Sequence, residues 1–344
     1  MPGHIFFRVG HYAEAEKWFA ASMAVDERYM REQQVAPDDD WNYVHNMMYA
    51  IANLMEQGKL KEANALSDHL AAARGRLSAT LYVWSARDQM ARISRRLPVA
   101  LRVGDWDSVL AMLQQAGLGE GAKTANLRFL AAELGDFATG MKALDGNDVA
   151  AAQAASERMD AGLWRIDHPD AGKDLAKTGD TGKKDQLEKD EKLLVSVLPD
   201  AESGPLVKCL SVASLELRAG VLAEQGKLQD AKELYASAAR EEKKLGYHEP
   251  PFYIRPVGEK EATSMLRAKD FAAARAAYET ALAERPASGF GLYGLALTRE
   301  LSGDPTGARE AYKAFIEAWP EADASLPEVM HARKALGDVA VAAR

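Results

Sequence analysis

The chain of 344 residues has a single cysteine, Cys209, so no disulfide can form within it. Cys209 lies in the apolar run 207–217, and we interpret it as a small buried side chain rather than a nucleophile. The sequence has no run of about 18 apolar residues, so we predict no membrane-spanning helix. The N-terminal residues lack the basic segment and long apolar core of a secretory signal, so the default prediction is a cytoplasmic protein.

Catalytic and cofactor signatures are also missing. The sequence contains no GxGxxG motif after a predicted strand, no GxxxxGK[ST], HExxH, GxSxG or CxxC motif, and almost no alternating pattern of β-strands. The formal net charge is −8 and no stretch is strongly basic, which argues against nucleic-acid binding. We therefore predict a protein that is not an enzyme and carries no cofactor.

Alanine is abundant, with 63 of the 344 residues. An excess of alanine over β-branched residues favours helices that pack closely through small side chains. The sequence therefore predicts an all-α fold.

A six-residue phrase recurs along the chain: a turn residue, a large residue two positions later and a small residue three positions after that. It occurs at Gly10-Tyr12-Ala15, Gly58-Leu60-Ala63, Gly104-Trp106-Val109, Gly226-Leu228-Ala231, Lys269-Phe271-Ala274 and Gly303-Thr306-Ala308, where Pro305 holds the usual large position. Each phrase separates two stretches of helical periodicity. This pattern is typical of helical hairpins, in which glycine ends the first helix and the small residue lets the two backbones approach.

The last two units repeat at 34 residues, from Lys269 to Gly303. They share further positions: Phe271, Ala274, Tyr278, Ala281, Leu282 and Pro286 in the first, and Leu295, Ala296, Gly303, Ala308, Tyr312 and Pro320 in the second. Over residues 212–322 the chain resembles the tetratricopeptide repeat (TPR) family. The segments MPGHIFFRVGHYAEAE, YVHNMMYAIANLMEQGK and YHEPPFYIRP resemble a group of bacterial TPR proteins with no settled activity, so that resemblance implies a fold and no reaction.

The expected fold is a right-handed superhelical solenoid of about seven TPR-like hairpins, ended by a capping helix. We expect N-terminal hairpins over 1–166, with the first one incomplete, and C-terminal hairpins over 193–326, followed by the capping helix and tail over 327–344. We place the fourth turn at Gly146, with Ala151 as the small residue. Gly135 is the alternative, which would shift one hairpin by 11 residues.

Residues 167–192 hold 14 charged residues in 26 and almost nothing apolar, which predicts a mobile surface insertion. We favour a tolerated insertion over a regulatory loop. At the other end, nine residues precede Gly10, whereas the first helix of such a unit needs about 14. We therefore expect the array to begin within a repeat.

The first helices of the hairpins line the concave face of a TPR array, so residues on them are predicted to face a ligand. In the N-terminal hairpins these are His4, Arg8, His45 and Met48. Of the other histidines, His11, His69, His168 and His331 lie on polar stretches and are predicted to be solvated.

In the C-terminal hairpins, Glu259, Arg267, Phe290 and Tyr293 are the predicted groove residues. Aromatic and charged side chains on a concave face suit an extended peptide or a helix. An alternative that stays open is that Phe290 and Tyr293 are core residues covered by a last helix at 327–336. In the connector HEPPFYIRP, the prolines impose a stiff geometry, and we favour packing of Phe252 and Tyr253 over exposure at a groove lip.

The predicted function is a non-catalytic scaffold that binds a protein or peptide partner in its concave groove. One alternative is a small-ligand or metal site in which His4, His45 and His248 are the candidate ligands, because imidazole suits zinc and copper. Another is a homo-oligomerisation module that uses the exposed face of the incomplete first hairpin.

Overall fold

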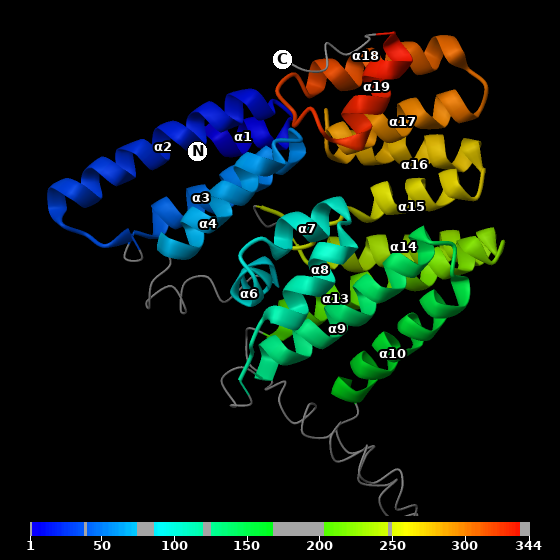
Figure 1. Ribbon diagram of the computed structural model, residues 1–344, viewed down its shortest axis with the longest axis horizontal. Helices are drawn as coiled ribbons and strands as arrows, with labels where there is room; N and C mark the ends of the chain where they lie inside the picture. The colour runs from blue at the N-terminus through cyan, green and yellow to red at the C-terminus, as the bar shows by residue number, and fades with distance from the viewer. Residues whose placement is uncertain are drawn as a thin grey trace, which may run out of the picture. The chain divides into compact units, whose positions relative to one another are not determined.

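The computed structural model describes residues 2–37, 40–73, 86–119, 125–167, 203–246 and 250–337 (Figure 1). The chain divides into two compact units. Unit 1 joins Met1–Leu81 with His248–Pro251 and Arg255–Arg344, and unit 2 comprises Tyr82–Tyr247 and Phe252–Ile254. The predicted insertion at 167–192 lies outside the described residues, apart from Asp167 at the end of a helix.

Unit 1 is built from nine described helices. They are α1 (Pro2–Arg8), α2 (Tyr12–Gln33), α3 (Trp41–Glu56), α4 (Leu60–Ala73), α15 (Val257–Arg267), α16 (Phe271–Glu284), α17 (Gly289–Leu301), α18 (Pro305–Ala318) and α19 (Pro327–Leu336). Unit 2 contains α6 (Ala86–Ile93), α7 (Leu97–Val103), α8 (Trp106–Gln115), α9 (Ala125–Asp145), α10 (Val149–Asp167), α13 (Ser203–Glu224) and α14 (Leu228–Lys244).

The all-α prediction is confirmed, since every regular element in the described part of the chain is a helix. Successive helices pack as hairpins: α1–α2, α3–α4, α7–α8, α9–α10, α13–α14, α15–α16 and α17–α18. The predicted capping helix is also present, because α19 packs on α18. Within the described residues, no helix has the length and apolar character needed to cross a bilayer.

All six turn phrases form the hairpin turns that they predict. The turn residues adopt left-handed φ angles of 80° at Gly10, 70° at Gly58, 78° at Gly104, 76° at Gly226, 62° at Lys269 and 84° at Gly303. At Gly303, its N–H donates to the Glu300 carbonyl over 3.1 Å, and the Asp304 N–H donates to the Arg299 carbonyl over 3.0 Å. These bonds satisfy carbonyls that the end of a helix leaves without intrahelical partners.

The small residue of each phrase lies where two helices approach. Ala15, Ala63, Val109, Ala231 and Ala274 are fully buried, and Ala308 is 4% exposed. A larger side chain at these positions would separate the helices, which explains why alanine recurs there.

The fourth turn lies next to Gly146, as predicted, and Gly135 is inside α9. The register differs by one residue. Asn147 is the left-handed residue, with φ of 58°, and Ala152 rather than Ala151 is fully buried. Asn tolerates the left-handed region because its short polar side chain bonds locally, which is why a GND sequence concealed the position of the turn.

Unit 1 brings together the first and last hairpins of the chain, coloured blue and orange to red in Figure 1. Trp319, which follows α18, is 2% exposed, and its Nε1 donates to the Glu56 carbonyl over 2.6 Å. A Cβ on Gly289 would lie 1.8 Å from that indole nitrogen, and one on Gly58 would lie 2.6 Å from the ring. Two glycines therefore leave the space that the indole fills.

Candidate functional site

The predicted groove histidines His4 and His45 meet in unit 1. Their Nε2 atoms lie 3.2 Å apart, and the two rings stack at 5.3 Å between centroids. Tyr49 makes edge contacts with both rings, at 4.1 Å from His4 and 4.7 Å from His45. His4 is 8% exposed and also packs on Phe19. The pair is therefore an imidazole contact within an aromatic cluster, with His45 as its more accessible member.

An N···N distance of 3.2 Å fits a hydrogen bond between imidazoles, one donating and the other accepting. It also resembles the roughly 3.3 Å between two nitrogens on a tetrahedral zinc with Zn–N bonds of about 2.0–2.1 Å. The number of ligands decides between these uses, because a zinc site takes at least three protein ligands. The described residues hold no group of three His, Cys, Asp or Glu that could bind a metal, and His248 lies outside them.

The other N-terminal groove residues differ in exposure. Arg8, the last residue of α1, is exposed, and Met48 on α3 is half-buried. Of the histidines predicted to be solvated, His11 and His69 are exposed as expected, and His168 lies outside the described residues. His69 Nε2 lies 3.2 Å from the Tyr43 hydroxyl.

The C-terminal groove residues are more involved in contacts within the fold than Arg8 and Met48 are. Glu259 is 3% exposed, and its Oε1 accepts from the Ser288 hydroxyl over 3.1 Å. The same hydroxyl lies 2.9 Å from Glu56 Oε2, so it joins carboxylates from α3 and α15. Arg285 adds a contact of 3.7 Å to Glu56. Arg267, at the end of α15, is half-buried.

Phe290 and Tyr293 pack against a core cluster that includes Phe315 and Trp319, as in the second of the two alternatives. The Tyr293 hydroxyl lies 2.8 Å from Nδ1 of His331 on α19. Burial and the neighbouring Glu328 and Glu300 raise the pKa of Tyr293 to about 12.

The solvated position predicted for His331 is wrong. It is half-buried, contacts the Tyr293 and Tyr312 rings, and its Nε2 lies 3.3 Å from Glu300. The signal that was missed is its place on the capping helix α19, between the buried Val329 and Ala332. This helix packs on α18, and His331 reaches Tyr293 of α17.

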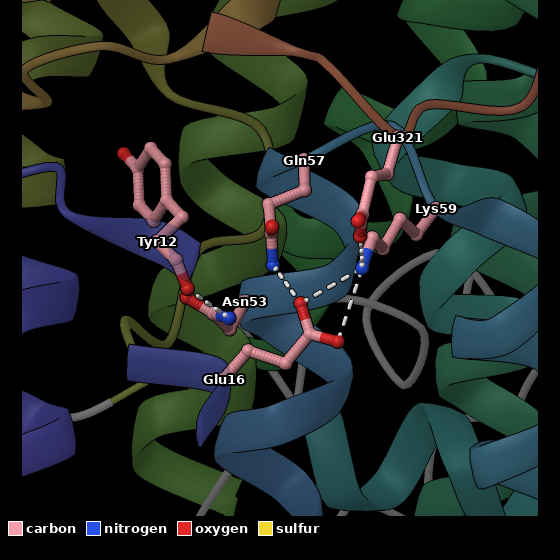
Figure 2. A network of polar contacts seen from close by, with 6 residues as sticks. All are labelled: Tyr12, Glu16, Asn53, Gln57, Lys59 and Glu321. Carbon is pink, nitrogen blue, oxygen red and sulfur yellow. Dashed lines mark hydrogen bonds and ion pairs between the residues drawn. The ribbon is translucent and has the colours of Figure 1, made fainter. Parts of the chain in front are cut away.

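A second joint between the ends of unit 1 surrounds Lys59, which is 6% exposed. Its Nζ lies 3.0 Å from Glu16 Oε2 and 2.6 Å from Glu321 Oε2. Figure 2 shows the Glu16 carboxylate between Lys59 and the amide of Gln57, which donates to it over 2.8 Å. Burial alone would lower the pKa of Lys59, but the bonds to Glu321 and Glu16 raise it, so the amine stays charged.

In unit 2, the connector packs as expected, because Tyr253 is 6% exposed and its hydroxyl donates to Glu216 over 2.5 Å. Cys209 is 2% exposed, and burial raises the pKa of its thiol to about 12. The prediction that Cys209 is buried is confirmed.

The most exposed apolar surface lies on the first hairpin. Among the described residues, eight large hydrophobic side chains are exposed, and five of them belong to residues 2–33: Ile5, Val9, Trp18, Val25 and Tyr29. Trp18, Val25 and Tyr29 are seven and four residues apart, so they share one face of α2. The helix α1 has 7 residues against 22 in α2, so it can cover only part of α2.

No protein-family model matches the chain, and no curated protein matches it. Among solved structures it is similar to the crystal structure of the yeast Tom70, with 12% sequence identity, 98% of this chain and 94% of that chain covered, and a TM-score of 0.29. A likeness this distant carries no argument about fold or function.

Proposed function

We propose that the chain is a non-catalytic scaffold of tetratricopeptide-like hairpins that binds a protein or peptide partner. The observation that carries this proposal is the apolar face of the first hairpin, where Trp18 is 49% exposed, Val25 53% and Tyr29 52%. Contiguous exposed apolar surface on a folded protein commonly marks an interaction site. Of the predicted groove residues, Arg8 is exposed at the same hairpin, so it is the one most accessible to a partner.

The charge of this hairpin suggests the chemistry of the partner. Its exposed charged residues are Arg8, Lys17, Arg28 and Arg31 against Glu14 and Glu32, in a chain of net charge −8. Basic residues are in excess among these exposed side chains, while Glu16, Asp26 and Glu27 of α2 are half-buried. This excess favours an amphipathic helix with acidic flanks, because opposite charges steer association and suppress wrong partners.

Selection of helical peptides from a displayed library on the wild-type protein tests this proposal. We expect the enriched peptides to be amphipathic and net acidic, and to bind at least tenfold more weakly to Trp18→Asp, a loss of about 1.4 kcal/mol. Their affinity should also fall with added salt. Trp164→Asp is the matched control, because Trp164 is a similarly exposed tryptophan, at 52%, in unit 2.

Enriched peptides that bind Trp18→Asp and the wild type equally would contradict the assignment of this face. A wild-type dimer that Trp18→Asp converts to a monomer, measured by sedimentation, would instead assign the face to a second copy of the chain. Arg8→Ala should weaken peptide binding less than Trp18→Asp, since exposed charges contribute little to affinity.

A further inference from the structure

Unit 2 contains a buried carboxyl group that the proposed function does not use. Glu133 lies in the middle of α9 and is 5% exposed. Its neighbours one helical turn away, Phe129, Leu130 and Phe137, belong to the core. Glu133 therefore occupies the apolar face of its helix, where α9 packs on α10 and α13.

The carboxyl group lies directly against the backbone of α10. A Cβ built on Gly162 would lie 2.0 Å from Glu133 Oε1, so a larger residue there would displace the carboxyl group. The second oxygen, Oε2, is buried and has no hydrogen-bond partner among the described residues. A buried carboxylate without such a partner is strongly disfavoured, whereas the neutral acid loses much less solvation.

The charged groups around Glu133 are largely committed to one another. On α9, Asp136 pairs with Arg158 of α10 over 2.6 Å. On α10, Asp160 accepts a short hydrogen bond from Ser214 of α13 and lies 3.8 Å from Arg218.

Other charged groups lie on the helices around α9, among them Glu216 of α13, which accepts a hydrogen bond from the Tyr253 hydroxyl. Arg165 on α10 is the cation that acts on Glu133. The remaining helices packed on α9 bring Arg92 from α6 and Asp107 from α8, and Asp107 pairs with Lys142.

The electrostatic balance follows from this arrangement. Burial raises the pKa of Glu133 to about 8; the Asp136 and Asp160 charges act in the same direction and Arg165 opposes them. The geometry and the charges agree, since both favour a proton on this carboxyl group at neutral pH.

We propose that Glu133 is a pH-sensitive switch in unit 2: α9, α10 and α13 stay packed while its carboxyl group is neutral and loosen when it loses its proton. The group ionises readily only when the helices separate and water reaches it. Alkaline conditions therefore favour local opening of this helix triplet, and acid favours its closure.

The expected pH dependence has a definite sign. In the opened state Glu133 has the ordinary value of 4.5, and in the closed state about 8. Between these values opening releases one proton, so the opening constant should rise about tenfold per pH unit and level off above pH 8.

Hydrogen exchange of the full-length chain, read by mass spectrometry, tests this proposal. After correction for the intrinsic pH dependence of exchange, we expect protection of α9 and α10 peptides to fall at least tenfold between pH 6 and pH 8. Peptides from α16 and α18 in unit 1 are the internal reference. In Glu133→Gln, which keeps the shape and removes the titration, the α9 and α10 peptides should keep their protection across this range.

Glu157→Gln is the control, because Glu157 is exposed on α10 and should leave the wild-type pH dependence unchanged. Equal pH dependence in Glu133→Gln and the wild type would overturn the proposal. Should Glu133→Gln not fold, infrared spectra of the wild type still decide. A protonated carboxyl band present at pH 6 and lost near pH 8 supports the switch, and its absence at pH 6 overturns it.

Discussion

Glu133 in unit 2 differs from the carboxyl groups at the joint of unit 1 in having no partner among the described residues for one of its oxygens. In unit 1, Glu16 and Glu56 lie at the joint between the ends of the chain and have partners, Lys59 for the first and Ser288 for the second. In unit 2, Glu133 lies between helices that are hairpin neighbours, and its Oε2 has no hydrogen-bond partner in the described part of the chain. The acids at the joint have partners that compensate for their loss of solvent, whereas Glu133 is tolerated in its unit only while it is neutral.

The largest expected effect is at the joint in unit 1. Trp319→Ala should destabilise unit 1 by about 3–5 kcal/mol, because it empties the space between Gly58 and Gly289 and removes a buried hydrogen bond. Denaturant unfolding of the full chain measures this loss. Trp18→Ala, which removes an exposed tryptophan, should change the stability by less than about 0.5 kcal/mol. Equal losses would mean that Trp319 does not hold the joint.

Glu133→Gln should stabilise unit 2 at high pH, which is opposite to the effect of Trp319→Ala on unit 1. A folded-state value raised from 4.5 to about 8 gives stability that is fully present below 4.5 and lost as the pH rises to 8. The glutamine variant avoids this loss, so its advantage over the wild type should grow with pH toward an upper limit of about 5 kcal/mol. Urea unfolding at pH 5 and pH 9 measures it. If the glutamine variant were more stable by the same amount at both pH values, ionisation of Glu133 would not be the cause, which would contradict the account.

Lys59→Met tests the ion pairs at the joint of unit 1. It removes the cation shared by Glu16 and Glu321 and should cost about 1–2 kcal/mol at pH 7, because Glu16 is only 30% exposed at its side chain. The loss should shrink in acid, because Lys59 lowers the pKa of Glu321 and this contribution is lost as Glu321 becomes protonated. Thermal unfolding at pH 3.5 and pH 7 checks this, and Lys61→Met on the same turn is the control.

The hairpin turns should behave alike in both units. Asp304 caps α18 by accepting from the Gly307 N–H over 2.9 Å, and Asp105 caps α8 in the same way over 3.1 Å. Removing either cap with alanine should cost about 1 kcal/mol. At the equivalent position of α14, Lys227 makes no side-chain cap, so Lys227→Ala should be neutral. Unfolding midpoints of the three variants give the comparison, and a loss at Lys227 equal to the others would contradict it.

The smallest effect is expected at Lys269, which has a φ of 62°. Lys269→Gly should stabilise unit 1 by about 0.5–1 kcal/mol, because glycine adopts this conformation without a Cβ penalty. Calorimetry should detect a rise in the melting temperature of unit 1. A decrease would show that the lysine side chain contributes more than the backbone strain costs.

The hairpins were predictable because each is encoded within about six residues of sequence. The left-handed φ angles at Gly10, Gly58 and Gly303 follow from one glycine each, and Ala15 and Ala63 are buried as their spacing requires. Asn147 shifts one turn by a residue because asparagine shares part of glycine's freedom.

The joint of unit 1 could not be read from the repeat. Trp319 meets Glu56 across 263 positions in the chain, and no local period encodes such a contact. The resemblance to a repeat array therefore predicted the order of the hairpins, but it did not predict the contact between the N-terminal and C-terminal hairpins of unit 1. Gly289 offered a partial signal, since a glycine that starts a helix suggests close packing.

Glu133 also carried a signal that sequence reasoning missed. It is spaced three and four residues from Leu130, Phe129 and Phe137, so helical periodicity places it on the apolar face. Gly162, in the middle of α10, indicates a close approach. Each signal alone has common explanations, and only the packing of α9 on α10 joins them.

The most direct test of the contrast between the units is a titration of the Glu133 carboxyl carbon by NMR, with glutamate labelled by carbon-13 and the resonance assigned through Glu133→Gln. We predict a midpoint near pH 8, while the resonance of Glu321, whose pKa Lys59 lowers, shows a carboxylate throughout neutral pH. A midpoint for Glu133 near the ordinary value of 4.5 would contradict the account, because the carboxyl group would then be ionised within the closed unit.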